Sequence, residues 1–235
     1  MMDKKAPIVL ALDTPNLETA LDWIKATEGV VSVYKLGLEF YLTFGRDGVM
    51  KILDHTNTDI FLDLKLHDIP HTVSAAALAI STLRPKYLTV HASGGRAMIS
   101  AAVQAVPNTL VTGVTILTSL SDDDVHEIGF RDNACESAVS LATLAVNAGA
   151  RAIVCSPLEI VDIRAAVGSD VTIIAPGVRP ADGAPADDQV RTMTPRQAIE
   201  NGANLVVIGR PITSEWINGP SAMRERAIHL AERIL

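Results

Sequence analysis

The sequence predicts a (β/α)8 barrel, built as one domain over residues 1–235. Short runs of β-branched and aliphatic residues alternate with segments of helical periodicity. Such alternation is typical of right-handed βαβ units and a parallel sheet. Eight of these runs are present, and 235 residues is a usual length for one α/β barrel. An open doubly wound sheet is the alternative, although it would usually need fewer repeats.

Each expected strand is a short apolar run. In chain order, the expected strands are residues 8–13, 30–37, 60–66, 87–92, 110–118, 152–156, 171–176 and 205–210. Amphipathic segments lie between and after them. The expected helices are approximately residues 16–27, 43–54, 72–84, 95–106, 134–148, 158–168, 195–201 and 220–234.

Helix signals support this division of the chain. In segment 134–148, apolar residues recur at the three- and four-residue steps of a helix face: Ala134, Ala138, Leu141, Ala145 and Ala148. Asn16 and Ser121 are expected to be helix N-caps, while Gly149 and Gly202 stand where helices should stop.

Composition and charge exclude several functions. A hydrophobic fraction of 48% is ample for a sizeable core, and the net charge of −7 argues against a nucleic-acid or anionic-membrane surface. The apolar run at residues 6–12 is short for a signal-peptide core, and no stretch approaches a membrane span. A soluble cytoplasmic protein is expected. Without a metal-ligand cluster, a Walker loop or a Gly-x-Gly-x-x-Gly motif, no metal or cofactor is expected.

The most informative segment is the third expected strand, residues 60–66. Its alternate residues 60, 62, 64 and 66 are aliphatic and should face the helices. Asp63 and Lys65 should point the other way, and Asp68 follows where the strand should end. A structural salt bridge is one interpretation. Charges that alternate at the C-terminal end of a barrel strand favour a reaction centre instead.

Other strands should deliver polar groups to the same rim. At their C-terminal ends stand Asp13, Lys35, His91, Thr118, Pro176 with Gly177, Arg179, Gly209 and Arg210. Lys35 and Lys65 are expected to interleave with Asp63 and Asp68 in one network of alternating charge. Taken alone, Asp13 could equally cap the next helix. By strand parity, His67 should face away from the charged set.

The ends of the last two strands indicate an anion site. Gly209 allows backbone N–H groups to approach an anion, and Arg210 supplies a fork of donors. Arg179 should face the same anion, so phosphate binding is predicted. The loop between Arg179 and Arg191 has the composition of a mobile lid, with an ordinary surface loop as the alternative.

These residues resemble the motifs of the orotidine 5′-phosphate decarboxylase family. The segment Asp63-x-Lys65-x-x-Asp68-Ile69-Pro70 resembles the family signature, although related sugar-phosphate decarboxylases and aldolases share its shorter form. Further matches cover nearly the whole chain: Leu12-Asp13, Tyr34-Lys35-Leu36-Gly37, His91-Ala92-Ser93-Gly94-Gly95, Leu117-Thr118-Ser119, Pro176-Gly177-Val178-Arg179-Pro180, Asp188-Gln189-x-Arg191 and Val207-Ile208-Gly209-Arg210-Pro211.

The resemblance implies conversion of orotidine 5′-monophosphate to uridine 5′-monophosphate and CO2, the last step of pyrimidine nucleotide synthesis, without metal or cofactor. It implies that Lys65 donates the proton to C6, that Asp63 lies against the substrate carboxylate, and that Lys35 and Asp68 hold the network rigid. The implied substrate-binding residues are Asp13 and Lys35 at the ribose, Thr118 at the base, Arg179, Gln189, Arg210 and the Gly209 backbone at the phosphate, and also Asp63, Ile69, Thr72 and Pro176.

The resemblance also implies a homodimer, in which Asp68 and Ile69 reach the site of the neighbouring subunit. Two alternatives stay open at this point. One is a sugar-phosphate decarboxylase or magnesium-dependent aldolase on the same barrel. The other is a catalytically silent nucleotide-binding barrel that acts as a sensor.

Overall fold

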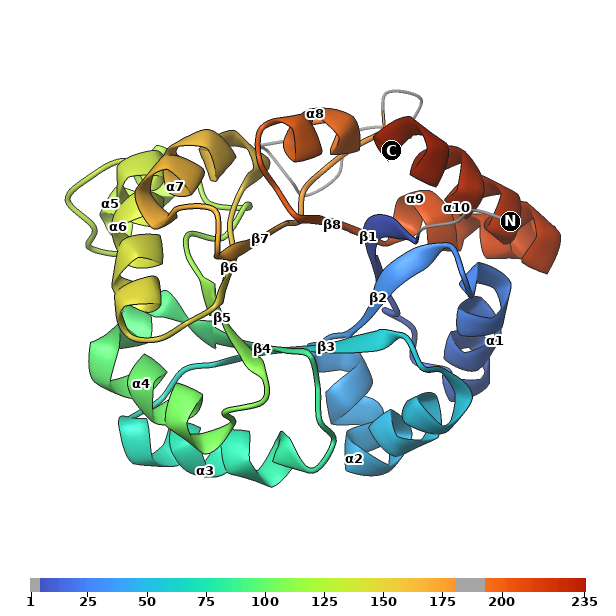
Figure 1. Cartoon of the computed structure of the whole chain (residues 1–235), viewed down its shortest axis with the longest axis horizontal. Helices are drawn as coiled ribbons and strands as arrows, with labels where there is room; N and C mark the ends of the chain where they lie inside the picture. The colour runs from blue at the N-terminus through green and yellow to red at the C-terminus, as the bar shows by residue number, and fades with distance from the viewer. Residues whose placement is uncertain (1–4, 181–192) are drawn as a thin grey trace.

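A computed structural model describes residues 5–180 and 193–235 of the chain (Figure 1). Eight parallel strands, β1 to β8, follow one another around a closed barrel, and β1 pairs with β8 to complete it. Helices form a ring outside the strands (Figure 1). The (β/α)8 barrel predicted from the alternating pattern is therefore confirmed.

The strands, in order, are β1 Ala6–Ala11, β2 Val31–Leu36, β3 Asp59–Leu66, β4 Tyr87–His91, β5 Leu110–Val114, β6 Ala152–Val154, β7 Thr172–Ala175 and β8 Leu205–Ile208. The α-helices are α1 Leu17–Thr27, α2 Leu38–His55, α3 Pro70–Ser81, α4 Gly95–Ala105, α5 Asp122–Glu127, α6 Ala134–Asn147, α7 Ile160–Val167, α8 Pro195–Glu200, α9 Arg210–Thr213 and α10 Pro220–Ile234. Short 3-10 helices occupy Ala92–Gly94, Pro157–Glu159 and Ser214–Asn218.

Most element boundaries differ from the predictions by a few residues. Helix α2 begins at Leu38 rather than near residue 43, and it contains a kink at Gly45, whose φ of 58° is outside the helical region. Strand β5 ends at Val114 instead of reaching Thr118. The expected caps are confirmed: Asn16 accepts a hydrogen bond from the Thr19 N–H, and Ser121 forms a capping box with Asp124.

Two apolar layers hold the barrel together. The larger layer lies between the strands and the helices, and its strand residues include Ile60, Leu62 and Leu64, as predicted from strand parity. The smaller layer fills the barrel interior and consists of Val9, Val33, Phe61, Tyr87, Ala152, Ile174 and Leu205. It supports the residues that lie two positions further along the same strands and face the same way.

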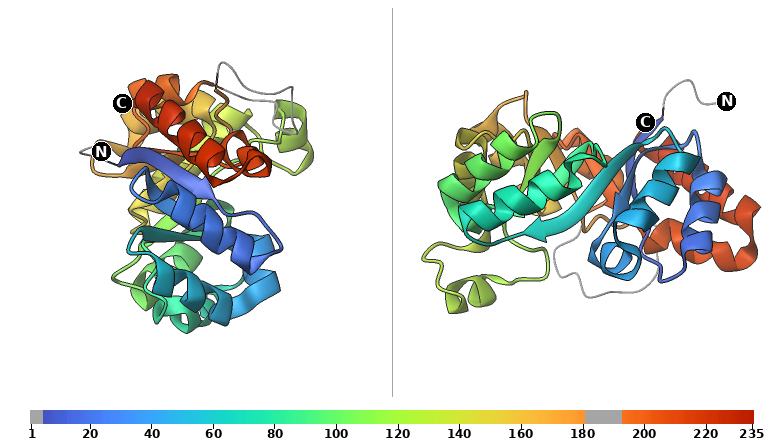
Figure 2. Two further views of the ribbon diagram at one scale, coloured as in Figure 1. Left: turned by 90° about the vertical axis from the view of Figure 1, so that its right-hand side faces the viewer. Right: turned by 90° about the horizontal axis from the view of Figure 1, so that it is seen from below.

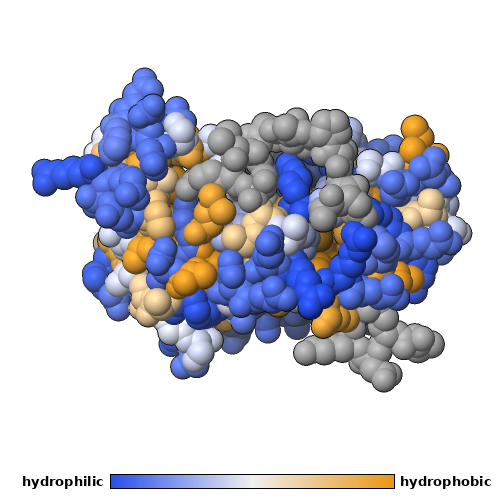
Figure 3. All heavy atoms as spheres, turned by 90° about the horizontal axis from the view of Figure 1, so that it is seen from above, coloured by the Kyte–Doolittle hydropathy of each residue, from blue (hydrophilic) through white to orange (hydrophobic). Residues whose placement is uncertain are grey.

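The last helix packs against the first elements of the described chain. Helix α10 packs against α1 and β1, and Figure 2 shows it beside the N-terminal elements from the side. The face of the molecule drawn in Figure 3 is dominated by hydrophilic residues, with apolar residues in small separate groups. Within residues 5–180 and 193–235, no helix combines the length and apolarity needed to span a membrane.

We expect Gly113→Ala to destabilise the barrel, because Gly113 lets α6 lie close to β5. A Cβ at this position would stand 2.8 Å from Cβ of Ala145, which is closer than real Cβ contacts. Overpacking of this kind costs about 1–3 kcal/mol of unfolding free energy, measurable by urea denaturation. Ala145→Gly should relieve the clash, so the double variant should lose less than the sum of the two single losses. Additive losses would contradict this account.

Candidate active site

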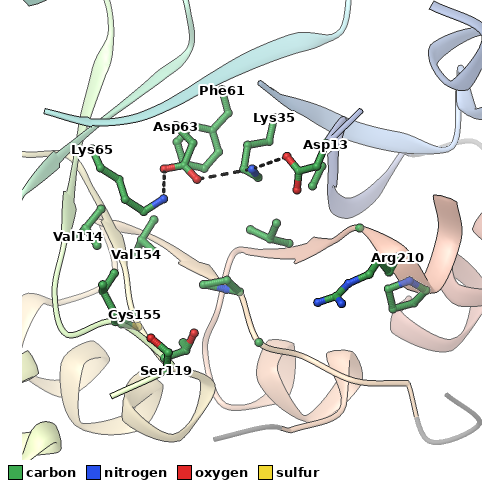
Figure 4. A pocket seen from close by; sticks show the side chains of 18 of the residues that line it. Asp13, Lys35, Phe61, Asp63, Lys65, Val114, Ser119, Val154, Cys155 and Arg210 are labelled. Atoms are coloured by element: carbon green, nitrogen blue, oxygen red, sulfur yellow. Dashed lines mark hydrogen bonds and ion pairs between the residues drawn. The ribbon is translucent and has the colours of Figure 1, made fainter. Parts of the chain in front are cut away.

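Four charged side chains from β2, β3 and the turn after β1 form a continuous row at the C-terminal rim of the barrel. We call Asp13, Lys35, Asp63 and Lys65 the charged row; Figure 4 shows it along one wall of a pocket. Lys35 Nζ lies 3.3 Å from Asp13 Oδ1 and 3.6 Å from Asp63 Oδ2. Lys65 Nζ donates a hydrogen bond to Asp63 Oδ1 over 2.8 Å. Charge therefore alternates along the row, with a carboxylate at one end and an ammonium at the other.

Asp63 is the most constrained member of the charged row. Its side chain is only 13% exposed, and burial by itself would raise its pKa. The charges of Lys35 and Lys65 oppose this effect, and hydrogen bonds from Lys65 and Thr89 add to theirs. The pKa of Asp63 is lowered as a result. Asp63 thus carries a negative charge at neutral pH, inside a largely water-free wall.

The backbone of β3 departs from a regular strand at the charged row. Leu62 pairs with Leu88 of β4 and Leu66 pairs with Val90, so the three β3 residues 63–65 face the single β4 residue Thr89. This is a bulge in the parallel ladder, and bulges re-aim side chains. Within it Lys65 has a φ of 47°, in the left-handed region that non-glycine residues rarely occupy. Strain of this kind is concentrated at functional sites.

Gly37 gives the charged row the room it needs. A Cβ on Gly37 would lie 3.0 Å from Lys35 Nζ and 3.3 Å from Asp13 Oδ1. Both contacts would be tighter than most Cβ contacts and would push polar groups apart. The glycine that follows β2 therefore allows this ion pair to form.

The pocket beside the charged row has a volume of about 580 Å³, which suits a small ligand. It brings together most of the predicted site residues: Asp13, Lys35, Asp63, Lys65, Thr118, Pro176, Arg179, Gly209 and Arg210. Arg210 lies apart from Lys65 in the pocket, so a cation stands at each of two separate places (Figure 4). An elongated ligand with two anionic groups would match this distribution of charge.

Other predicted residues are placed elsewhere. Asp68, Ile69 and Thr72 belong to an exposed segment at the start of α3 and do not line the pocket. The Asp68 carboxylate accepts a hydrogen bond from the Ile69 N–H. Within one chain, Asp68 is therefore not part of the charged row, and Asp13 is the second carboxylate there. A contribution of Asp68 from a neighbouring subunit stays a prediction. Gln189 and the lid expected up to Arg191 lie outside the described residues.

His67 is also placed differently from the prediction. Its ring centroid lies 5.3 Å from that of His91, which ends β4, rather than on the far side of the sheet. The irregular backbone at Lys65 breaks the parity on which the prediction depended. Burial, the charge of His67 and the charge of Lys65 lower the pKa of His91, while Asp63 acts in the opposite direction. His91 is thus kept neutral to a lower pH than an ordinary histidine.

Sequence reasoning missed several residues of this region. Ser119, Cys155 and Thr213 line the pocket, and Thr89 contacts Asp63 without lining the pocket. For Thr89 a signal was available, because it is the polar residue between Tyr87 and His91 on the inward face of an otherwise apolar strand. The others gave no comparable signal: Ser119 and Cys155 lie in the segments that follow β5 and β6, and Thr213 ends the short helix α9.

The fold and the pocket together define a β/α-barrel enzyme whose charged residues stand at the C-terminal ends of the strands. Comparison with known proteins gives the family. The sequence model that describes the orotidine 5′-phosphate decarboxylase / HUMPS family matches residues 6–224 of this chain. The chain belongs to this family, as its motifs indicated.

Named relatives agree with this assignment. The orotidine 5′-phosphate decarboxylase of Thermobifida fusca is 52% identical over 88% of this chain and 89% of its own length. That of Opitutus terrae is 48% identical over 87% and 90%, respectively. The crystal structure of orotidine 5′-phosphate decarboxylase from Lactobacillus acidophilus matches with a TM-score of 0.81 and 34% identity, covering 96% of this chain and 99% of that one.

We expect Asp63 to make folding sensitive to acid. Because its pKa is lowered in the folded state, the unfolded chain binds the proton first as the pH falls. The stabilisation is present above about pH 4 and is lost as the pH falls through the lower, folded-state pKa. The unfolding free energies of the wild type and Asp63→Asn, measured in urea, should differ more at about pH 6 than near pH 3.5. A constant difference would contradict the predicted linkage.

Proposed function

We propose that this protein decarboxylates orotidine 5′-monophosphate to uridine 5′-monophosphate and CO2, with Lys65 as the proton donor to C6 of the pyrimidine. The observation that carries the proposal is the direct contact between Lys65 and the ionised, buried Asp63 in the pocket wall. Family membership and the names of the relatives support the reaction itself. The roles of individual residues are inferred from their positions.

The chemistry requires stabilisation of negative charge at one carbon. When the bond between C6 and the carboxylate breaks, its electron pair stays on C6 in an orbital that the ring cannot delocalise. CO2 departs, and a proton must then reach C6. An ammonium group held in advance beside C6 would both stabilise the charge and supply that proton. Lys65, held by Asp63 in the wall of the pocket, is suited to this role.

Asp63 would act on the substrate as well as on Lys65. A second carboxylate placed beside an ionised Asp63 experiences repulsion, which is relieved when CO2 leaves. This ground-state contribution requires that Asp63 keep its charge, and its lowered pKa supports that requirement. Lys35 would hold Asp63 in place through an ion pair with the other carboxylate oxygen, Oδ2.

The remaining pocket residues would hold the rest of the nucleotide. Asp13 and Lys35 would hydrogen-bond the ribose, while Thr118 and Pro176 would line the base. Arg179, Arg210 and the Gly209 N–H would bind the phosphate, with Gln189 as a further contact predicted from the sequence alone. Arg210 lies apart from Lys65 in the pocket, as a phosphate at the far end of a nucleotide would require (Figure 4). Phosphate binding can then support the reacting centre from a distance.

A homodimer is part of the proposal. Ile69 is 64% exposed at the start of α3, and Leu38 and Leu42 are 47% and 81% exposed in the first turns of α2. These helices follow the neighbouring strands β2 and β3, so the apolar side chains emerge at the same end of the barrel. If a partner subunit covered these side chains, Asp68, Ile69 and Thr72 of this chain would lie near the pocket of the partner. A cytoplasmic location stays a prediction from the sequence.

Loss of absorbance by orotidine 5′-monophosphate, followed in EDTA with the purified protein, tests the reaction. We expect rapid loss with uridine 5′-monophosphate as the product, and a fall of at least about 10³-fold in kcat for Lys65→Ala. Lys51→Ala, on the outer helix α2, is the matched control and should retain wild-type turnover. No turnover by folded wild-type protein would refute the reaction and favour a ketose phosphate substrate with magnesium. Unchanged turnover by Lys65→Ala would refute the assigned proton donor.

Subunit mixing tests the contribution of Asp68 across the interface. Lys65→Ala and Asp68→Asn should each be nearly inactive as homodimers. In a hybrid dimer, one site has Lys65 from one chain and Asp68 from the other, so random exchange should restore about a quarter of wild-type activity. Mixtures in which both chains carry Asp68→Asn provide the control. Mass spectrometry should first verify that hybrid dimers have formed. If activity is still not recovered, Asp68 does not contribute to the site of the neighbouring subunit.

A further inference from the structure

Thr89 connects the two reacting residues of the site through one hydroxyl group. Its Oγ1 donates a hydrogen bond to Asp63 Oδ1 over 3.1 Å and accepts one from the Lys65 backbone N–H over 2.8 Å. The side chain is fully buried and does not line the pocket, so it cannot contact a ligand there. Thr89 can therefore act only through the residues that it holds.

The need for this hydroxyl arises from the bulge in β3. In a regular parallel ladder, the Lys65 N–H would donate to a backbone carbonyl of the next strand. Here residues 63–65 stand opposite Thr89 alone, and the ladder is interrupted. The hydroxyl takes the place of the missing carbonyl and satisfies an N–H that would be costly to bury without a partner.

The same hydrogen bond holds a strained backbone. Lys65 keeps its φ of 47° only if its surroundings outweigh the conformational cost. On the other side, Asp63 Oδ1 receives hydrogen bonds from both Lys65 Nζ and Thr89. One hydroxyl group thus fixes the start of the lysine side chain and the carboxylate that orients its end.

We propose that Thr89 is a positioning residue for decarboxylation, whose hydroxyl holds the bulged Lys65 backbone and the Asp63 carboxylate in their reactive arrangement. This inference rests on the proposed function for its kinetic consequence. Its structural consequence is independent of the reaction: without the hydroxyl, the Lys65 backbone should leave the left-handed region, or the ion pair with Asp63 should lengthen.

Thr89→Val, which keeps the shape and removes the hydroxyl, tests the proposal. Because misplacement of a reacting group by about 1 Å can cost about 10²-fold in rate, kcat should fall on the order of 10- to 100-fold. KM should stay within about threefold, because the groups assigned to the phosphate and ribose are untouched. Thr89→Ser should recover most of the lost kcat. If Thr89→Val fails to fold, as judged by circular dichroism, Thr89→Ala removes the same hydroxyl and carries the same expectation.

Thr112→Val is the matched control. Thr112 is equally buried, stands opposite Thr89 in register on β5, and donates its hydroxyl to the Leu110 carbonyl rather than to a site residue. Its substitution should leave kcat within about threefold of the wild type. Equal losses in Thr89→Val and Thr112→Val, or no rescue by Thr89→Ser, would overturn the proposal.

A crystal structure of Thr89→Val separates this inference from the proposed function. A displaced Lys65 backbone or a lengthened contact between Lys65 and Asp63 would support the positioning role, even if the wild type did not act on orotidine 5′-monophosphate. An unchanged Lys65 φ together with an unchanged contact would overturn that role, whatever the activity of the wild type.

Discussion

The ion pairs of Asp63 with Lys35 and Lys65 are the interaction on which the rest of the site depends. Each of these groups is partly or largely removed from water, and an isolated buried charge would be neutralised by proton transfer. The two ammonium groups lower the pKa of the Asp63 carboxylate and so keep it charged. As a contribution to stability alone, such a buried arrangement is inefficient, because desolvation offsets much of the attraction. Its value lies in presenting charge to a reacting molecule without further reorganisation.

The barrel holds this network with a regular part and an irregular part. The regular part is the interior apolar layer, in which Val33 and Phe61 lie two residues before Lys35 and Asp63 and set their level in the barrel. The irregular part is the bulge, where three residues of β3 face Thr89. A continuous ladder would carry the backbone past Lys65 in an ordinary extended conformation. The barrel therefore combines a rigid base with one strained residue at the point where chemistry is proposed.

The charged residues of the pocket form two groups that come from different parts of the chain. The charged row lies on β1, β2 and β3 and the turns that follow them, while the arginines assigned to phosphate follow β7 and β8. The closed barrel brings these distant parts of the chain around one opening, with β8 directly beside β1. The net charge of −7 is therefore compatible with an anionic substrate. Local cations near the ligand matter more than the total charge of the surface.

The residue pattern alone was enough to predict the barrel, the strand that carries Asp63 and Lys65, and the polar residues that most strands bring to the pocket. Period-two and helical patterns are local, and strand ends in a parallel barrel meet at one rim. Which charges are in contact depends on the folded barrel. Within one chain, it placed Asp13 beside Lys35, turned His67 towards His91, and set Thr89 opposite the bulge. These outcomes depend on register between strands and on a backbone conformation at Lys65 that no residue pattern encodes, because both arise from packing between segments distant in the chain.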